Sequence, residues 1–213
     1  MARLSWRTVT EPAEERYEVK KSIFIANVSP IETPEQAMDF LRAAKSKYPD
    51  ARHHVYAWKV GGETIMKKYS DDGEPAGTGG MPVLDLIEKQ NLDDVIVVVT
   101  RYFGGVLLGT GGLSRAYSKA AELGITAAKP CQMTILCQYA IEVEYGDADR
   151  LLYALKKADF CIGETTYLTR PTLHIGCEAE EIPSLEKTVM DQTAGRATIT
   201  FLGKSASRRD DVS

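Results

Sequence analysis

The strongest constraint on this fold is a run of five consecutive aliphatic residues, Val95 to Val99. A strand exposed on one face alternates apolar and polar residues, whereas an unbroken aliphatic run is typical of a strand covered on both faces. The run therefore predicts a central strand with other elements packed on each side. An acidic, glycine-rich segment (DDGEPAGTGG) precedes it, and an arginine, two aromatic residues and two glycines (RYFGG) follow it.

The segments around this strand predict a mixture of helices and strands. Thr33 has the side chain and spacing of a residue that caps a helix. Two β-rich runs flank Gly61-Gly62 and predict a hairpin, because glycine tolerates the positive φ of such turns. Further helices are expected to open at Pro82 and at Gly111-Gly112. Residues 1–16 lack periodicity and are expected to form a loose arm.

A second unit is expected to begin at Lys129-Pro130, which divides the chain into domains 1–129 and 130–213. After Pro130 the pattern reads β-α-β-β-α-β, with Asp147 expected to cap the first helix. That order specifies a ferredoxin-like domain, with two helices on one face of an antiparallel sheet. The chain is thus predicted to be a two-domain α+β protein. The tail, SASRRDDVS, is expected to be disordered.

The charge distribution excludes a broadly basic nucleic-acid binder. Residues 1–129 hold 17 Lys+Arg and 17 Asp+Glu, whereas residues 130–213 hold 9 and 13, which gives the net charge of −4. Proteins that bind duplex DNA usually carry a basic surface, because displaced counterions supply much of the affinity. Any contact with nucleic acid must therefore be a local patch.

Cysteine usage and hydropathy indicate a cytoplasmic protein. The four cysteines (Cys131, Cys137, Cys161 and Cys177) follow Pro130 and form no C-x-x-C pair, so we expect buried, reduced thiols. No apolar run approaches the roughly 18 to 20 residues that a membrane helix needs. The first residues show no apolar block with a small-residue cleavage site, so neither a secretion signal nor a membrane contact is expected.

The segment after the aliphatic run is the strongest candidate for a binding site. A strand that ends in a glycine-rich loop opening a helix can direct backbone N–H groups toward an anion such as phosphate. Aromatic side chains at the strand end can stack on a base or fill a pocket of a partner, or they can complete the core. The candidate residues of this 101–115 loop and its helix are Arg101, Tyr102, Phe103, Gly104, Gly105, Gly109, Gly111, Gly112, Arg115 and Lys119.

A second candidate, a polar site, consists of Asp71, Asp72 and Glu74 with one of two histidines, His54 being the favoured one. Carboxylates and an imidazole can hold a divalent metal or perform acid–base chemistry. Alternatively, the aspartates cap backbone N–H groups of a turn. Adjacent side chains of a strand point to opposite faces, so at most one of His53 and His54 can face a given site.

Several familiar active-site motifs are missing from the sequence. GTGGLS is not G-x-G-x-x-G, and no G-x-x-x-x-G-K-[ST] or G-x-S-x-G is present. We therefore predict no catalytic residue, no metal site and no cofactor.

The run from Gly80 to Gly109 resembles the signature of the IMPACT/YigZ family, and DDGEP also looks like that family. The resemblance covers about Lys20 to Ala128, and the remainder resembles the C-terminal domain of the bacterial YigZ branch. The residues that carry it are Gly80, Val83, Leu84, Ile87, Leu92, Val98, Val99, Arg101, Tyr102, Phe103, Gly104, Gly105, Leu108 and Gly109.

The resemblance implies an α+β first domain like the second domain of a small-subunit ribosomal protein. It also implies a ferredoxin-like second domain similar to the last domain of elongation factor G. Eukaryotic relatives act in translational control: they bind an activator of a stress kinase that phosphorylates an initiation factor. The bacterial branch lacks that kinase.

Three hypotheses follow for the function. The first is a non-enzymatic binding protein linked to translation, which contacts RNA or a ribosome-associated protein through Arg101, Tyr102, Phe103 and the glycines. The second is a hydrolase that uses Asp71, Asp72 and Glu74 with one histidine. The third is a protein-interaction module that does not bind nucleic acid. We expect binding rather than catalysis.

Overall fold

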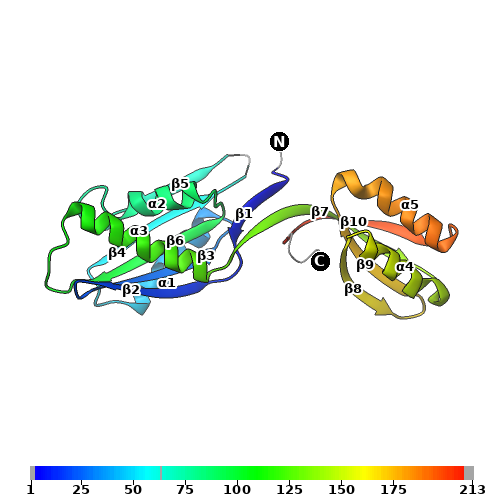
Figure 1. The fold of residues 1–213 in the computed structure, drawn as a ribbon, viewed down its shortest axis with the longest axis horizontal. Helices are drawn as coiled ribbons and strands as arrows, with labels where there is room; N and C mark the ends of the chain where they lie inside the picture. The colour runs from blue at the N-terminus through cyan, green and yellow to red at the C-terminus, as the bar shows by residue number, and fades with distance from the viewer. Residues whose placement is uncertain (1–2, 63, 209–213) are drawn as a thin grey trace. The chain divides into compact units, whose positions relative to one another are not determined.

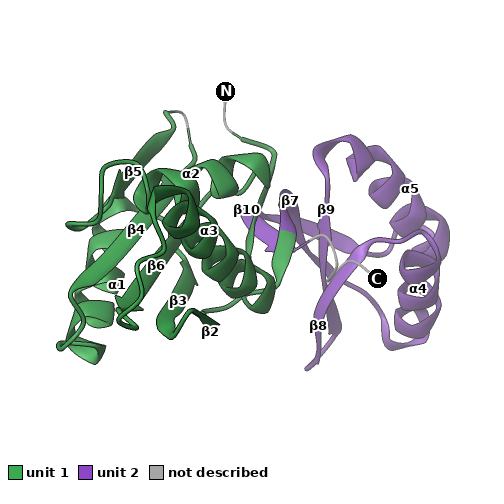
Figure 2. Cartoon of the chain, turned by 60° about the vertical axis from the view of Figure 1, so that its left-hand side comes forward, with its two compact units in different colours: residues 1–131 green, residues 132–213 purple. Residues whose placement is uncertain are grey.

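The computed structural model describes residues 3–62 and 64–208, which form two compact units. The units divide between Cys131 and Gln132 (Figure 2). Each unit has its own sheet and its own buried core. The chain is therefore a two-domain α+β protein, as the sequence predicts.

The first unit is built on a five-stranded antiparallel sheet with β6 at its centre (Figure 1). The order of the strands across the sheet is β2 (Ala13–Val19), β3 (Ser22–Pro30), β6 (Val95–Tyr102), β4 (His53–Val60) and β5 (Met66–Ser70). β6 pairs with β3 on one side and β4 on the other. The prediction of a central strand from the aliphatic run is confirmed.

Helices cover both faces of this sheet, which explains the unbroken apolar run. Val97 and Val99 belong to a core shared with α2 (Gly80–Lys89) and α3 (Thr110–Ala127). Ile96 and Val98 belong to a separate core on the opposite face, shared with α1 (Pro34–Lys47). Alternate side chains of β6 are thus buried on alternate faces.

The start of α1 confirms the expected cap. The Thr33 hydroxyl accepts a hydrogen bond from the Gln36 N–H at 3.3 Å. The Gln36 side-chain oxygen in turn accepts one from the Glu32 N–H at 2.6 Å. Two backbone donors that the first turn leaves unsatisfied therefore find side-chain partners.

The expectation of a loose arm before residue 17 is wrong. Residues in this region form β1 (Ser5–Val9) and most of β2, and β2 pairs with β3 along its whole length. The turn between β2 and β3 uses Lys20 and Lys21, with φ of 47° and 63°. Lysines at such angles give no glycine signal, which is why the hairpin escapes sequence reasoning.

The second unit has the ferredoxin-like order. Its antiparallel strands lie in the order β10 (Thr198–Arg208), β7 (Pro130–Glu142), β9 (Pro171–Cys177) and β8 (Cys161–Tyr167). The connecting helices are α4 (Tyr145–Lys157) and α5 (Ile182–Thr193), with a short 3-10 helix at Ala179–Glu181 before α5. Side chains from both helices and the sheet form one core.

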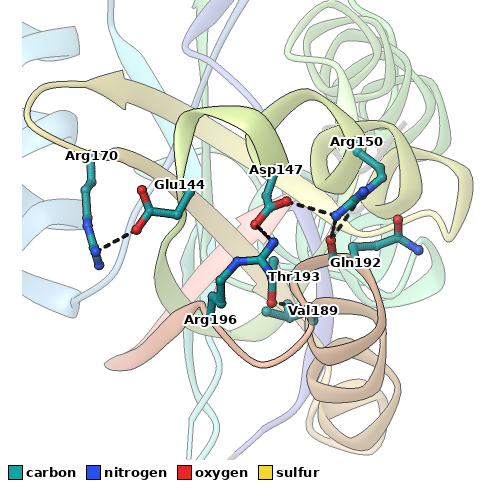
Figure 3. A network of polar contacts seen from close by, with 8 residues as sticks. All are labelled: Glu144, Asp147, Arg150, Arg170, Val189, Gln192, Thr193 and Arg196. Carbon is teal, nitrogen blue, oxygen red and sulfur yellow. Dashed lines mark hydrogen bonds and ion pairs between the residues drawn. The ribbon is translucent and has the colours of Figure 1, made fainter.

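The expectation that Asp147 caps α4 is wrong. The N-cap residue is Glu144, and Asp147 lies in the first turn of the helix. Its buried carboxylate accepts hydrogen bonds from Arg150 at 2.9 Å and from Arg196 at 2.7 Å (Figure 3). Arg150 also donates through Nε to the Gln192 carbonyl at 3.1 Å. The cluster joins the start of α4 to the end of α5, so its role is structural.

The expectation of a disordered tail is only partly open to comparison. β10 extends to Arg208, so the first residues of that segment form a strand, and residues 209–213 lie outside the described part. Of the four cysteines, Cys131, Cys137 and Cys177 are buried and Cys161 is half-buried. Over the described ranges, no helix combines the length and apolar character needed to cross a membrane.

Candidate functional site

A cleft of about 600 Å³ lies where β6 ends. We call it the β6 cleft; the acidic turn, the end of β6, the glycine loop and the start of α3 all contribute to it. The residues that line it are Asp50, Arg52, His53, Glu74, Pro75, Arg101, Tyr102, Phe103, Leu107, Leu108, Gly109, Thr110 and Leu113. The two segments that the sequence singles out on either side of β6 therefore meet at one place.

A buried polar network contributes to the β6 cleft. Arg101 Nη1 lies 2.6 Å from Glu74 Oε1, and the two side chains are 8% and 3% exposed. The Tyr117 hydroxyl of α3 donates to the same oxygen at 2.7 Å. Burial, and then the charge of Glu74, raises the pKa of Tyr117 far above its usual range, so the hydroxyl stays protonated and donates.

This network changes the role of Arg101. Its side chain is not displayed to solvent as expected, because Arg101 follows Val97 and Val99 onto the face of β6 that α3 covers. The guanidinium carbon lies 5.5 Å from the centre of the Phe24 ring and 5.6 Å from that of Phe103. Arg101 therefore holds the local architecture together, and its charge is balanced within the protein.

The two aromatic residues after Arg101 have different environments. Tyr102 is half-buried, and its hydroxyl donates to Asp50 Oδ1 at 2.7 Å. This hydrogen bond, more than burial, raises the pKa of Tyr102. Phe103 is 56% exposed. Of the two, Phe103 is the ring that can meet a partner.

The glycine loop is shaped by a close approach and by two left-handed residues. A Cβ at Gly104 would lie 2.0 Å from the Lys21 carbonyl carbon, and the Gly104 N–H donates to the Ser22 hydroxyl. Gly105 and Gly109 have φ of 82° and 70°, a region that glycine adopts without steric cost. The loop carries Val106 and Leu107, whose side chains are exposed.

Four of the expected site residues belong to α3 rather than to the loop. Gly111 and Gly112 lie in the first turn of α3, which begins at Thr110. Arg115 and Lys119 line a separate shallow hollow and not the β6 cleft. Lys119 forms an ion pair with Glu122 at 2.7 Å.

The three carboxylates in the acidic turn have different structural partners. Asp71 accepts hydrogen bonds from the N–H groups of Gly77, Gly79 and Gly80 at 2.8 to 2.9 Å. The Asp72 carboxylate accepts from the His54 N–H at 2.7 Å and pairs with Lys45 at 3.2 Å. Only Glu74 reaches Arg101, so the three carboxylates do not converge on one reacting centre.

The histidines exchange the roles expected of them. His54 is buried against the Tyr48 carbonyl, 3.1 Å from Nε2, and burial lowers the pKa of its imidazole. His53 lines the β6 cleft, and its Nδ1 lies 2.9 Å from the Asp72 carbonyl oxygen. Since a carbonyl can only accept, Nδ1 donates, and in the neutral imidazole Nε2 is then the acceptor.

Sequence reasoning missed several residues of the site. Asp50 and Arg52 come from the connection before β4, and nothing in the sequence links them to a segment some fifty residues later. Tyr117 is a buried aromatic residue of α3, and its sequence context resembles that of any core residue. Leu107 and Leu108 left a signal that could have been used, since two adjacent leucines among loop glycines are seldom all buried.

Known families match both units. The model of the Impact N-terminal domain matches residues 20–125, and that of a domain of unknown function (DUF1949) matches residues 141–196. IMPACT family member YvyE of Bacillus subtilis is 30% identical over 208 residues, which cover 95% of this chain and 96% of YvyE. IMPACT family member YigZ of Escherichia coli is 32% identical over 193 residues, which cover 90% and 95%.

One solved structure is similar to this chain over nearly the whole length of both. The crystal structure of a hypothetical protein is 31% identical and superposes with a TM-score of 0.60 over 92% of this chain and 97% of that one. The two-domain translational regulator Yih1 is also 31% identical, with a TM-score of 0.37 over 57% of this chain and 46% of its own. By its sequence over nearly its whole length, this chain belongs to the IMPACT family.

Proposed function

We propose that this member of the IMPACT family is a non-enzymatic binding protein of translational regulation that meets a protein partner at the β6 cleft. The single observation that carries the proposal is the contrast between the polar network and the rim of that cleft. Arg101 and Tyr117 both donate hydrogen bonds to Glu74 inside the protein. Phe103, Val106 and Leu107 are exposed.

The exposed apolar side chains support recognition of a macromolecule. Leu107 is 83% exposed and Val106 44%, and both follow a pair of glycines in the loop beside Phe103. Adjacent exposed apolar side chains commonly mark a site of protein contact. Large apolar anchors surrounded by polar groups are the usual centre of such an interface.

The state of the polar groups supports binding over catalysis. A general acid or base must reach a substrate with a free proton or lone pair. The carboxylates of Asp71 and Asp72 hold backbone N–H groups, and Glu74 holds Arg101 and Tyr117. The hydrolase hypothesis requires these carboxylates to face a substrate together, which they do not.

The second unit supports a protein partner over RNA. Ferredoxin-like domains that bind RNA stack bases on aromatic side chains of the open sheet face. Ile141 and Ile175 face the helices, so their neighbours Ala140, His174 and Thr200 lie on the other face. None of these three is a phenylalanine, tyrosine or tryptophan.

Family membership supports the link to translation. The resemblance described above implies that eukaryotic relatives bind a protein that activates a stress kinase. A ribosome-associated protein is therefore the partner class that we propose for this chain.

Co-sedimentation with ribosomes tests the proposal. The wild-type protein is expected to sediment with ribosomes, and Leu107→Ser is expected to reduce the affinity about tenfold or more, because it removes an anchor. Leu168→Ser is the matched control, since Leu168 is 77% exposed on the other unit. Equal sedimentation of both variants, or binding to protein-free ribosomal RNA alone, would contradict the proposal.

A further inference from the structure

We infer that the β6 cleft is built to receive an acidic peptide segment whose apolar residues rest on the glycine loop. The inference rests on the proposed function, because it names the chemistry of the partner at the same site. Three features carry it: an exposed arginine at the rim that forms no ion pair with any described residue, an aliphatic lining, and an imidazole whose Nδ1 faces a backbone carbonyl.

The positive charge at the rim has no internal partner. Arg52 lines the β6 cleft, is exposed and makes no ion pair with any described residue. The nearest acidic group in sequence, Asp50, already accepts the Tyr102 hydroxyl. Glu74, the other carboxylate of the lining, is neutralised by Arg101. Of the two arginines in the lining, Arg52 is therefore the one whose charge is available to a carboxylate of a partner.

Two further lysines add positive charge beside the glycine loop. Lys20 and Lys21 form the turn between β2 and β3, and the backbone of Lys21 lies against Gly104 of the loop. Both lysines are exposed, and neither forms an ion pair within the described ranges. Salt screens exposed charges over about 10 Å at 0.1 M ionic strength and over about 30 Å at 0.01 M, so lysines beside the glycine loop favour an acidic partner at low salt.

The lining beside Arg52 is aliphatic. Leu107, Leu108, Leu113 and Pro75 line the β6 cleft together with Phe103. Aliphatic side chains of a peptide can be buried there, which contributes roughly 25 cal/mol per Å² of apolar surface. Bases of RNA would need stacked rings, and Phe103 is the exposed ring among the described lining residues.

His53 provides a hydrogen-bond acceptor in the same cleft. Its Nδ1–H donates to the Asp72 carbonyl, so the Nε2 lone pair is available. Nε2 has no hydrogen-bond partner among the described residues. An extended peptide presents N–H groups at regular spacing, and Nε2 can accept one of them. The cleft thus offers a cation for a side-chain carboxylate and an acceptor for the peptide backbone.

Selection from a library of random 12-residue peptides tests the inference without knowledge of the partner. The purified full-length protein is the target, and Leu107→Ser, Arg52→Glu and the control Leu168→Ser are selected in parallel. Peptides that combine Asp or Glu with aliphatic residues are expected for the wild type and the control. Arg52→Glu is expected to shift the selected peptides toward Lys and Arg, and Leu107→Ser to abolish enrichment.

Fluorescence anisotropy of the most enriched peptide then gives the magnitude. Replacing its Asp and Glu by Asn and Gln is expected to weaken binding to the wild type about tenfold or more, and to leave binding to Arg52→Glu unchanged or tighter. Urea unfolding checks that each variant is folded; Arg52 and Leu107 are exposed, so their replacement leaves the cores intact.

The outcomes separate the inference from the proposed function. Enriched peptides without acidic residues that still require Leu107 would overturn the inference and leave the proposed function standing. Enrichment that does not depend on Leu107, or no enrichment at all, would overturn both. Tighter binding of a 12-nucleotide single-stranded RNA than of any selected peptide would also overturn the inference.

Discussion

Arg101 and Glu74, 27 residues apart in the sequence, form an ion pair that is almost completely buried, with 2.6 Å between Nη1 and Oε1. Each residue belongs to one of the two segments that flank the aliphatic run. Their pairing brings the acidic turn and the end of β6 together at one place. The pair fixes the polar network of the β6 cleft, and the rim remains free for a partner.

Replacing Glu74 by Gln is expected to destabilise the first unit by about 3–5 kcal/mol, because the Arg101 charge would remain buried without a counter-charge. The double variant Glu74→Gln, Arg101→Met should recover much of this loss, since it removes the uncompensated charge. Urea unfolding followed by tryptophan fluorescence measures both free energies. A loss below about 1 kcal/mol for Glu74→Gln would show that the pair is not buried in solution.

The stability of the first unit is expected to fall as the pH is lowered through 6.5. Burial lowers the pKa of His54 below the 6.5 of a free imidazole, so the unfolded chain binds a proton before the folded one does. The contribution of His54 to the unfolding free energy is fully present above pH 6.5. As the pH falls below 6.5, this free energy decreases by at most about 1.4 kcal/mol per pH unit.

Unfolding free energies measured from pH 8 to pH 5 test this dependence on His54. His54→Gln should show a shallower fall across this range, although it will be less stable at pH 8. His53→Gln is the matched control, because that imidazole lies at the cleft rather than in the core. Parallel curves for His54→Gln and the wild type would contradict the assignment.

Gly104→Ala is expected to destabilise the protein by about 1–3 kcal/mol, because the added methyl group would overlap the backbone of Lys21. Backbone cannot move aside as a flexible side chain does. Gly146→Ala provides the control: a Cβ there meets nothing within 4 Å, and alanine favours the helix by up to about 1 kcal/mol. Thermal unfolding should separate the two variants, and similar melting temperatures would refute the close contact.

Cys177 is expected to resist alkylation in the native protein at pH 8. Burial raises the pKa of its thiol to about 11, so little thiolate exists and the little that forms is shielded. The half-buried Cys161 should react with iodoacetamide first in the native protein. In about 8 M urea, which unfolds most domains of this size, all four cysteines should react. Peptide mass spectrometry after timed quenching gives the order; rapid labelling of Cys177 would contradict this environment.

The regular elements were predictable where one physical signal dominated. The aliphatic run of β6, the Thr33 cap of α1 and the β-α-β-β-α-β order of the second unit each follow from periodicity or capping alone. β2 escaped because its burial alternates weakly among charged residues, as is typical of an edge strand. The turn after β2 has lysines at positions of positive φ, where a glycine would have indicated a hairpin.

The site was predictable in its location but not in its contacts. Both flanking segments do line one cleft. The role of Arg101 is not evident from the aliphatic run, which ends at Val99. Strand alternation places Arg101 on the same face as Val97 and Val99, and α3 covers that face. The contribution of Asp50 and Arg52 depends on tertiary proximity, which no local pattern encodes.

The polar network of Glu74, Arg101 and Tyr117 is separate from the rim residues of the β6 cleft. Under the proposed function, this separation affects how the specificity of such a protein can change. The side chains of the polar network come from three different segments of the chain. Their hydrogen bonds do not involve residues 106–108 or residue 52. The scaffold can therefore be retargeted by exchanging a handful of rim positions, much as loops are exchanged on an antibody framework. Under the proposed function, exchanges at the rim change what the cleft binds and leave the hydrogen bonds of Glu74 in place.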